Sequence, residues 1–237
     1  MTLDPALTEA LRATSTGTIH TILLKKGIRR TWMRGPRPAF HAGERIVGPA
    51  FTLRFVPARE DLATPASWAS PRSTRGAIED MPEGCVAVVD AMGDASAGIF
   101  GDLLCARMMK RGVAALVTDG ALRDAVGIEA TRLPVWCAGV AAPASVTSLT
   151  FVNWREPIGC GGVAVFPDDV IVADGDGAVV IPAAFVEEVA KAGPEQELLE
   201  LWILREIERG EPLPGLYPPN EATLERYRRE RGGADRV

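Results

Sequence analysis

The spacing of apolar residues differs between segments of this chain. Continuous or alternating apolar residues predict strands, and apolar residues on one helical face predict helices. Residues 85–90 (CVAVVD) and 113–119 (VAALVTD) are short, continuous apolar runs, which are typical of strands buried on both faces. Between them, residues 101–111 place apolar side chains on one helical face and end in Lys110 and Arg111, where cations favour a helix C-terminus. Strand, helix and strand make a βαβ unit, so we expect parallel strands and a right-handed crossover.

Further apolar runs predict the rest of a sheet. The segment 45–56 alternates in its second half, as a half-buried strand does, and 134–139 follows a short predicted helix at 126–131 as a third parallel strand. Three later runs are separated by Pro-Asp and Asp-Gly-Asp turns, which predicts an antiparallel meander over 162–166, 169–173 and 177–182. The expected fold class is α/β, with a parallel βαβ core and an antiparallel meander.

The N-terminal part is expected to be helical over its first forty residues. Ser15 or Thr16 can cap a short helix that Gly27 ends. The segment 57–75 is rich in Pro, Ser and Ala and is the longest irregular stretch, with a short helix expected at 76–80. Irregular segments of this length tend to be functional or mobile.

The C-terminal part also shows a helical period, over 183–210 and 221–231. A broad apolar face around Trp202 predicts that this part either covers the body or packs on a neighbouring copy. The patterns together predict one domain over residues 1–190 and a helical extension over residues 191–237.

Composition narrows the possible functions. The 237 residues are 47% apolar and carry a net charge of −5, without the basic surface that nucleic-acid binding needs. No window holds the roughly 18 apolar residues of a membrane helix, and the acid-containing N-terminus lacks a signal-peptide core. We therefore expect a cytoplasmic protein with neither a membrane nor a nucleic acid as partner. Its cysteines have no zinc-like spacing and are expected to be reduced and mostly buried: Cys85, Cys105, Cys137 and Cys160.

Charged residues stand where the parallel strands are expected to end. Asp102 begins the predicted helix, and Arg123 and Asp124 follow the second strand, so all three should lie at the carboxyl edge, where parallel sheets bind ligands. An arginine can hold an oxyanion, and two carboxylates can hold a hard cation such as magnesium.

The start of the predicted helix adds anion-binding groups. The amides of Leu103 and Leu104 lack partners within the helix and, with the positive end of its dipole, can hold a carboxylate or phosphate. Gly101 lets a ligand approach the backbone closely. The whole set suits a small anionic substrate chelated to a metal ion.

An alternative interpretation assigns these charges to structure alone. Asp102 can act as a helix cap or first-turn acid, Asp124 can cap the helix at 126–131, and Arg123 can pair with either acid. On spacing alone this alternative is the better supported of the two.

Other polar residues are less distinctive. With only two histidines, His20 and His41, a histidine triad or histidine-rich metal site is not expected, and both are interpreted as packing or surface residues. Arg72 and Arg75 lie in or beside the irregular segment and could contact a distal substrate carboxylate, although a solvated loop is the better supported interpretation of the two.

The segment 101–124, GDLLCARMMKRGVAALVTDGALRD, resembles the signature of the RraA-like family. ERIVGPAFTLRF, PVWCAG and GGVAVFPDDVIVADGDGAVVIP resemble its first strand, the strand after the signature and its closing meander. The likeness covers residues 14–190 and implies the family's layered β/β/α domain. The family includes class II aldolases that cleave 4-hydroxy-4-methyl-2-oxoglutarate and 4-carboxy-4-hydroxy-2-oxoadipate and decarboxylate oxaloacetate.

The resemblance also implies residue roles. Asp124 would be the ligand of a divalent metal, Mg²⁺ or Mn²⁺, and Arg123 would hold the keto oxygen of a 2-keto acid and stabilise an enolate. Asp102 would orient water near the carbon that is protonated, and the amides of Leu103 and Leu104 would bind the pyruvyl carboxylate. The resemblance further implies a homotrimer or homohexamer.

Three features leave alternatives open. In the aldolases an acid from a neighbouring subunit's C-terminal helix helps to complete the site, and several residues compete for that role here: Glu187, Glu188, Glu195 and Glu197. The namesake of the family binds and inhibits a ribonuclease, so a protein-binding regulator is the alternative function. A dehydratase of a sugar-derived 2-keto acid could use the same metal site.

Overall fold

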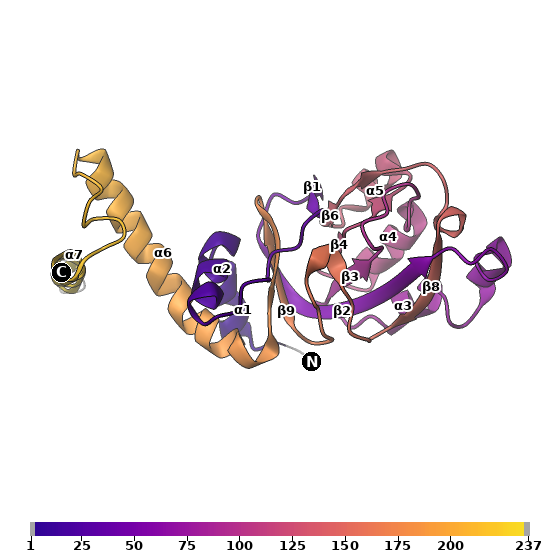
Figure 1. Ribbon diagram of the computed structural model, residues 1–237, viewed down its shortest axis with the longest axis horizontal. Coiled ribbons are helices and arrows are strands. Elements are labelled where there is room, and N and C mark those ends of the chain that lie inside the picture. The colour runs from indigo at the N-terminus through magenta and orange to yellow at the C-terminus, as the bar shows by residue number, and fades with distance from the viewer. Residues whose placement is uncertain (1–2, 235–237) are drawn as a thin grey trace.

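An eight-stranded mixed sheet forms the centre of the body in the computed structural model, which describes residues 3–234 (Figure 1). Its strands follow the order β1-β6-β4-β3-β2-β9-β10, with β8 pairing to β2, and β5 and β7 form a separate two-stranded sheet. The strands are β1 (Arg37–Phe40), β2 (Ile46–Pro57), β3 (Val86–Asp90), β4 (Ala115–Thr118), β5 (Ala121–Leu122), β6 (Val135–Cys137), β7 (Gly139–Val140), β8 (Leu149–Trp154), β9 (Val170–Asp174) and β10 (Gly177–Ile181).

Helices pack on the sheet in two groups. α3, α4 and α5 cover one face of the parallel strands, whereas α1, α2 and the first half of α6 pack against the β9–β10 hairpin (Figure 1). The helices are α1 (Pro5–Arg12), α2 (Thr16–Lys25), α3 (Thr74–Asp80), α4 (Asp102–Lys110), α5 (Ala125–Thr131), α6 (Val186–Glu208) and α7 (Glu221–Ala234). Within residues 3–234, no helix combines the length and apolar character that crossing a bilayer demands.

The predicted βαβ unit is confirmed. β3 and β4 are parallel, with Val86 opposite Ala115, and every residue of both strands is buried. α4 connects them and packs Cys105 and Met108 into the core below the sheet. The third parallel strand, β6, pairs with β4 as expected. The α/β fold class therefore follows from apolar runs that are short, continuous and buried on both faces.

The long strand β2 joins the parallel part of the sheet to the antiparallel part. Its first residues pair antiparallel with β9, and the stretch from Ala50 to Arg54 pairs parallel with β3. Gly48 lies near this change of partner, where an added Cβ would come within 2.5 Å of the Gly84 carbonyl oxygen. A larger side chain at this position would force the two segments apart.

Two predictions of secondary structure are wrong. Residues 162–166 are not a strand, because Gly161 and Gly162 have φ of 58° and 77° and Val165 forms only an isolated bridge to Ile158. The meander is therefore reduced to the β9–β10 hairpin. The first forty residues are helical only as far as α2, since residues 26–36 are irregular and residues 37–40 form β1. β1 pairs antiparallel with β6, and the prolines at 36 and 38 cannot donate backbone hydrogen bonds within a helix.

Local signals at the N-terminal helix are confirmed. The Ser15 hydroxyl accepts a hydrogen bond from the Thr18 amide at 3.1 Å and caps α2, and Gly27 has φ of 84° just beyond its end. All four cysteines are free and buried, as predicted. Burial raises the pKa of Cys85 to about 12, so this thiol stays protonated near neutral pH.

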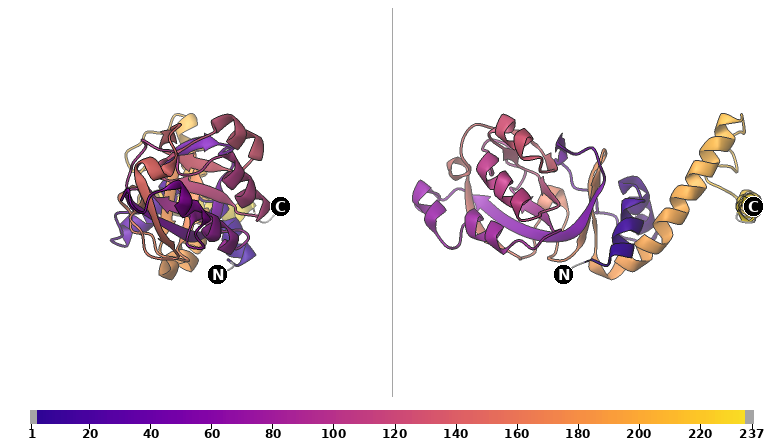
Figure 2. Two further views of the ribbon diagram at one scale, coloured as in Figure 1. Left: turned by 90° about the vertical axis from the view of Figure 1, so that its right-hand side faces the viewer. Right: turned by 180° about the vertical axis from the view of Figure 1, so that it is seen from behind.

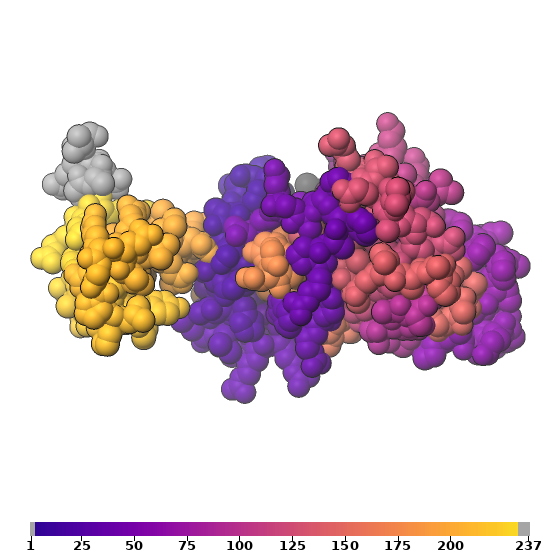
Figure 3. All heavy atoms as spheres, turned by 90° about the horizontal axis from the view of Figure 1, so that it is seen from above, coloured from indigo at the N-terminus to yellow at the C-terminus, as the bar shows by residue number. Residues whose placement is uncertain are grey.

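The C-terminal extension leaves the body as a continuous helix. α6 crosses residue 190 without a break and projects beyond the body, and α7 folds back beside its far end (Figures 2 and 3). Trp202 packs on Tyr227 of α7 with ring centroids 5.6 Å apart, so the apolar face around Trp202 covers α7 and not the body. Other apolar side chains of α6 remain exposed, namely Leu198, Leu201, Leu204 and Ile207.

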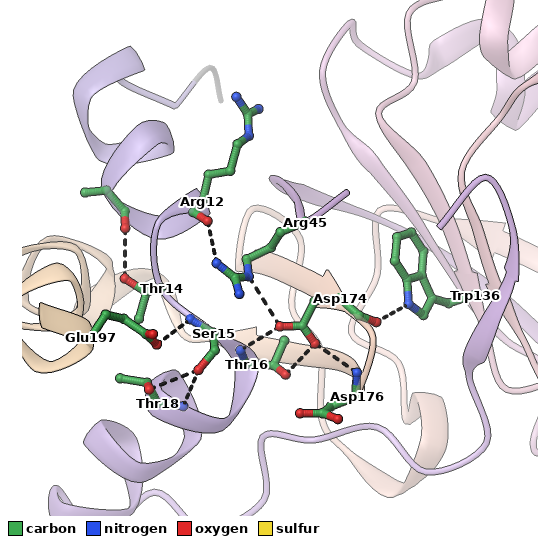
Figure 4. A network of polar contacts seen from close by, with 11 residues as sticks. Arg12, Thr14, Ser15, Thr16, Thr18, Arg45, Trp136, Asp174, Asp176 and Glu197 are labelled. Atoms are coloured by element: carbon green, nitrogen blue, oxygen red, sulfur yellow. Dashed lines mark hydrogen bonds and ion pairs between the residues drawn. The ribbon is translucent and has the colours of Figure 1, made fainter. Parts of the chain in front are cut away.

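A partly buried carboxylate connects the N-terminal helices to the hairpin (Figure 4). Asp174, at the end of β9, accepts hydrogen bonds from the Thr16 hydroxyl at 2.7 Å, the Thr16 amide at 3.0 Å and the Asp176 amide at 3.0 Å. Arg45 adds an ion pair at 3.3 Å, and only 14% of the Asp174 side chain is exposed. Burial alone would raise the pKa of Asp174, but these donors outweigh it, so the pKa lies below its usual value.

We expect Asp174→Ala to lower the free energy of unfolding by about 3 kcal/mol at pH 7, because several donors lose a charged acceptor. Asp174→Asn keeps the shape of the side chain and one acceptor oxygen, so its free energy of unfolding should fall by less than that of Asp174→Ala. Because the folded pKa is lowered, the carboxylate's contribution is present above the unfolded pKa of about 3.9 and is lost as the pH falls through the folded value. Urea unfolding of the three proteins at pH 7 and pH 3 measures this; equal unfolding free energies at pH 7 would contradict the role of Asp174.

Candidate active site

A cavity of about 290 Å³ lies at the carboxyl edge of the parallel strands. The beginning of α4, the turn between β5 and α5, and the irregular segment around Trp68 form its walls. The structure brings together all the residues that the sequence nominated for this edge: Gly101, Asp102, Leu103, Leu104, Arg123 and Asp124. Residues from two loops that are separated along the chain thus line one small volume.

Asp124 takes an unusual backbone conformation at the head of α5. Its φ of 60° and ψ of 46° are left-handed, a region that Asp tolerates better than most residues. Its carboxylate makes no capping hydrogen bond to α5 and instead accepts one from Arg123 Nε at 3.1 Å. The interpretation of Asp124 as a side-chain cap is therefore wrong, whereas the expected pairing of Arg123 with a neighbouring acid is confirmed.

Three glycines make room for the charged side chains. An added Cβ would lie 2.4 Å from Asp124 Oδ2 at Gly101, 2.5 Å from Asp102 Oδ2 at Gly127, and 2.6 Å from Arg123 Cβ at Gly98. Gly101 was expected to admit a ligand, and the group that approaches it here is the Asp124 carboxylate. Gly98 and Gly127 could not be identified from the sequence, because their close neighbours come from other segments and no local pattern marks them.

The beginning of α4 presents Asp102 and two backbone amides to the cavity. Asp102 is the first residue of the helix, and its Oδ1 accepts a hydrogen bond from the Leu103 amide at 2.7 Å. Leu103 as a whole residue is 80% exposed. Asp102 is thus a first-turn acid, as the structural alternative predicted, and it occupies one of the two amides that were expected to hold a substrate carboxylate.

The outer wall of the cavity carries a further positive charge. Arg75 lines the cavity, and its guanidinium carbon lies 5.2 Å from the centre of the Trp68 ring, which also lines it. Arg72 instead lines a neighbouring cavity. Of the two arginines that were considered for a distal carboxylate, Arg75 has the suitable position.

The donor atoms of the site fit a hard divalent cation. Asp102 and Asp124 both line the cavity and offer only oxygen, and residues 3–234 contain no group of three or more His, Cys, Asp or Glu placed to hold a metal. Mg²⁺ commonly binds through one or two carboxylates and takes its remaining ligands from water and substrate. Asp124 would hold such an ion, because its carboxylate is not used as a helix cap.

Sulfur chemistry is not available beside these acids. Cys105 lies in α4 below the site, where burial, followed by the nearby Asp102, Cys137 and Asp124, raises its pKa to about 12. The thiol therefore stays protonated near neutral pH and is a poor nucleophile.

The other nominated polar residues lie away from this cavity. His20 Nδ1 is 2.8 Å from the Thr31 hydroxyl, and His41 Nε2 is 2.6 Å from the Glu129 carbonyl oxygen. Of the C-terminal acids, Glu188 pairs with Lys26, Glu195 pairs with Arg231, and Glu197 accepts a hydrogen bond from the Ser15 amide at 2.8 Å. Glu187 is exposed on the first turn of α6.

We expect Gly101→Ala to impair the site without unfolding the protein. The new Cβ would overlap Asp124 Oδ2, the mobile end of a side chain, so the carboxylate should turn away at little cost in stability. A displacement of about 1 Å in a catalytic group can lower turnover about a hundredfold. The rate of the lyase reaction that the resemblance implies and the thermal unfolding midpoint measure the two effects, and Gly43→Ala is the control because its added Cβ meets nothing within 4 Å. Unchanged turnover in Gly101→Ala would contradict the assigned position of Asp124.

Comparisons with known proteins show the family and the fold of this chain. A family model described as RraA-like, Aldolase/RraA, matches residues 8–180. A protein of Halalkalibacterium halodurans, provisionally named as a 4-hydroxy-4-methyl-2-oxoglutarate aldolase, is 34% identical over 154 residues, or 65% of this chain and 68% of that protein. Protein DlpA of Legionella pneumophila is 31% identical over 147 residues, which cover 62% of this chain but only 23% of DlpA.

Solved structures show the same fold. Streptomyces coelicolor RraAS2, described as an unusual member of the RNase ES inhibitor RraA protein family, aligns with a TM-score of 0.76 at 34% identity, covering 85% of this chain and 97% of that one. An uncharacterized protein from Pseudomonas syringae pv. tomato has a TM-score of 0.76 at 22% identity, covering 92% of this chain and 99% of that one, a likeness of fold.

Proposed function

This chain belongs to the RraA-like family, and we propose that it is a divalent-metal-dependent lyase that cleaves a carbon–carbon bond of a pyruvyl substrate. The substrate class would be 4-hydroxy-2-oxo diacids, with decarboxylation of oxaloacetate as a second activity. One observation carries the proposal: Arg123, Asp124, Asp102 and the start of α4 line a single small cavity. The aldolase name of the relative from Halalkalibacterium halodurans supports the same reaction class.

The bound metal would supply Lewis acidity that polarises the keto group of the substrate. Arg123 would hold the keto oxygen and stabilise the negative charge that develops there when the bond breaks. Its Nε is paired with Asp124, so the two terminal nitrogens of the guanidinium remain for the substrate. The Asp124 carboxylate orients this guanidinium and would also hold the metal.

The substrate carboxylate would bind at the beginning of α4. The Leu104 amide faces no partner within the helix, and the Leu103 amide becomes available when Asp102 turns toward the substrate. Asp102 would then orient a water molecule that supplies the proton to the carbon that carries the enolate charge. Arg75, which lines the same cavity, would attract the distal carboxylate of a diacid.

Removal of metal tests this function directly. We expect metal-stripped protein to release no pyruvate from oxaloacetate above the rate of a protein-free sample, and added Mg²⁺ or Mn²⁺ to restore release. Samples containing the ions without protein are the control, because free divalent ions also promote this decarboxylation. Protein-dependent release that persists without metal, or no release with either ion, would contradict the proposal.

Protein binding is the second candidate function, favoured by the 34% identity to RraAS2 and its description as a member of a ribonuclease-inhibitor family. The exposed leucines of α6 offer apolar surface for such a contact. A stoichiometric complex between Arg123→Ala protein and a purified ribonuclease of the RNase E type, together with absent lyase turnover in the wild type, would favour this candidate.

A further inference from the structure

A second and larger cavity, of about 490 Å³, lies apart from the candidate active site. It is open to solvent, and its walls include the start of α2, the segment from Arg29 to Arg34 and the turn at Gly161–Val163. It shares no lining residue with the cavity at Arg123 and Asp124. The chemistry proposed above makes no use of it.

The lining of this cavity is strongly positive. Arg29, Arg30 and Arg34 line it, and none of these three guanidinium groups forms an ion pair or hydrogen bond with any residue in the described range 3–234. The lining includes one acid, Asp176, so three positive charges and one negative leave a net charge of +2. A concave site with unpaired charges of one sign concentrates the potential and attracts counter-ions.

The groups around the arginines are held firmly in place. Trp32 Nε1 donates to the Asp176 carbonyl oxygen at 2.9 Å, and Arg37 lies 5.5 Å from the centre of its ring. At Gly162 an added Cβ would lie 2.9 Å from Arg34 Nη2, so the absence of a side chain there lets the Arg34 guanidinium lie across the turn.

The start of α2 is fixed by the Asp174 network described above. Thr16, which lines the cavity, uses both its amide and its hydroxyl to bind the Asp174 carboxylate (Figure 4). On the next turn of the helix, His20 contacts the Thr31 hydroxyl. The walls are therefore held by contacts between distant segments, whereas the arginine side chains have no partner among the described residues and remain available for a ligand.

We propose that this cavity binds a small organic phosphate monoester. A guanidinium group can donate two parallel hydrogen bonds to two phosphate oxygens. A phosphate monoester carries nearly two negative charges at neutral pH, which balance the net charge of +2 on the lining. The volume suits a small metabolite, and the half-buried Trp32 provides apolar surface for its organic part. The site is independent of the lyase proposal.

Titration calorimetry with three probes tests the proposal: glucose 6-phosphate, adenosine monophosphate and inorganic phosphate. We expect saturable binding of at least one ester, tighter than that of inorganic phosphate and weakened by added salt. The Arg29→Ala/Arg30→Ala double variant should bind that ester at least about tenfold more weakly than the wild type. The affinity of Arg29→Lys/Arg30→Lys should lie between these two, because lysine keeps the positive charge but lacks the planar pair of N–H donors of a guanidinium.

Arg229→Ala is the matched control, because Arg229 is an exposed arginine on α7 that lies outside this cavity. It should bind the ester as the wild type does, and thermal unfolding midpoints show whether each variant is folded. Three results would overturn the proposal: no saturable binding of either ester at millimolar concentration, equal affinity in the folded double alanine variant, or inorganic phosphate binding as tightly as both esters.

Discussion

Replacing Arg123 by alanine is expected to lower metal-dependent pyruvate release by about 10² to 10³-fold, because the site loses its preorganised partner for the developing oxyanion. The fold should survive the change. The Arg123 amide still donates to the Phe100 carbonyl oxygen at 3.0 Å, and the removed side chain is 38% exposed with one ion pair. Exposed pairs of this kind contribute little to stability.

Arg123→Lys separates charge from geometry at this position. Lysine keeps one positive charge but lacks the planar fork, so we expect most of the activity to be lost in this variant as well. Arg229→Ala removes the same charge far from the cavity and should leave turnover unchanged. Wild-type turnover in folded Arg123→Ala protein would exclude the proposed role and shift support to the protein-binding candidate.

Asp124→Asn is expected to abolish the metal response, with turnover falling by at least about a hundredfold, because a neutral amide is a much weaker ligand for a hard cation. Asparagine is the informative substitution because, like aspartate, it tolerates the left-handed conformation that position 124 adopts with φ of 60°. Alanine would add backbone strain at this position, so the effect of a lost metal ligand could not be separated from the effect of a distorted turn.

The experiment follows Mn²⁺ binding by electron paramagnetic resonance together with pyruvate release. Asp168→Asn is a matched control, since Asp168 also has a positive φ, of 71°, and lies outside the cavity in the turn before β9. It should bind Mn²⁺ as the wild type does. Undiminished Mn²⁺ binding and turnover in Asp124→Asn would show that another group holds the metal.

The secondary structure could be predicted where each segment has a single environment. β3 and β4 are buried on both faces, so their apolar runs were sufficient to predict them as strands. The helix cap at Ser15 could be predicted because it is a contact between residues three positions apart. Prediction failed where distant partners decided the outcome. β1 exists because it pairs with β6, and the run at 162–166 is bent by two left-handed glycines beside Arg34.

The sequence by itself determined the βαβ unit, the edge of the sheet that carries the site, and the charged residues that meet there. These follow from local periodicity and from the rule that parallel strands end at one edge. Only the tertiary structure decided that Gly98, Gly101 and Gly127 leave space for Arg123, Asp124 and Asp102, and that three arginines line a second cavity beside Gly161. The physical reason is that close packing between distant segments depends on distances of a few ångströms, which no local pattern of residues encodes.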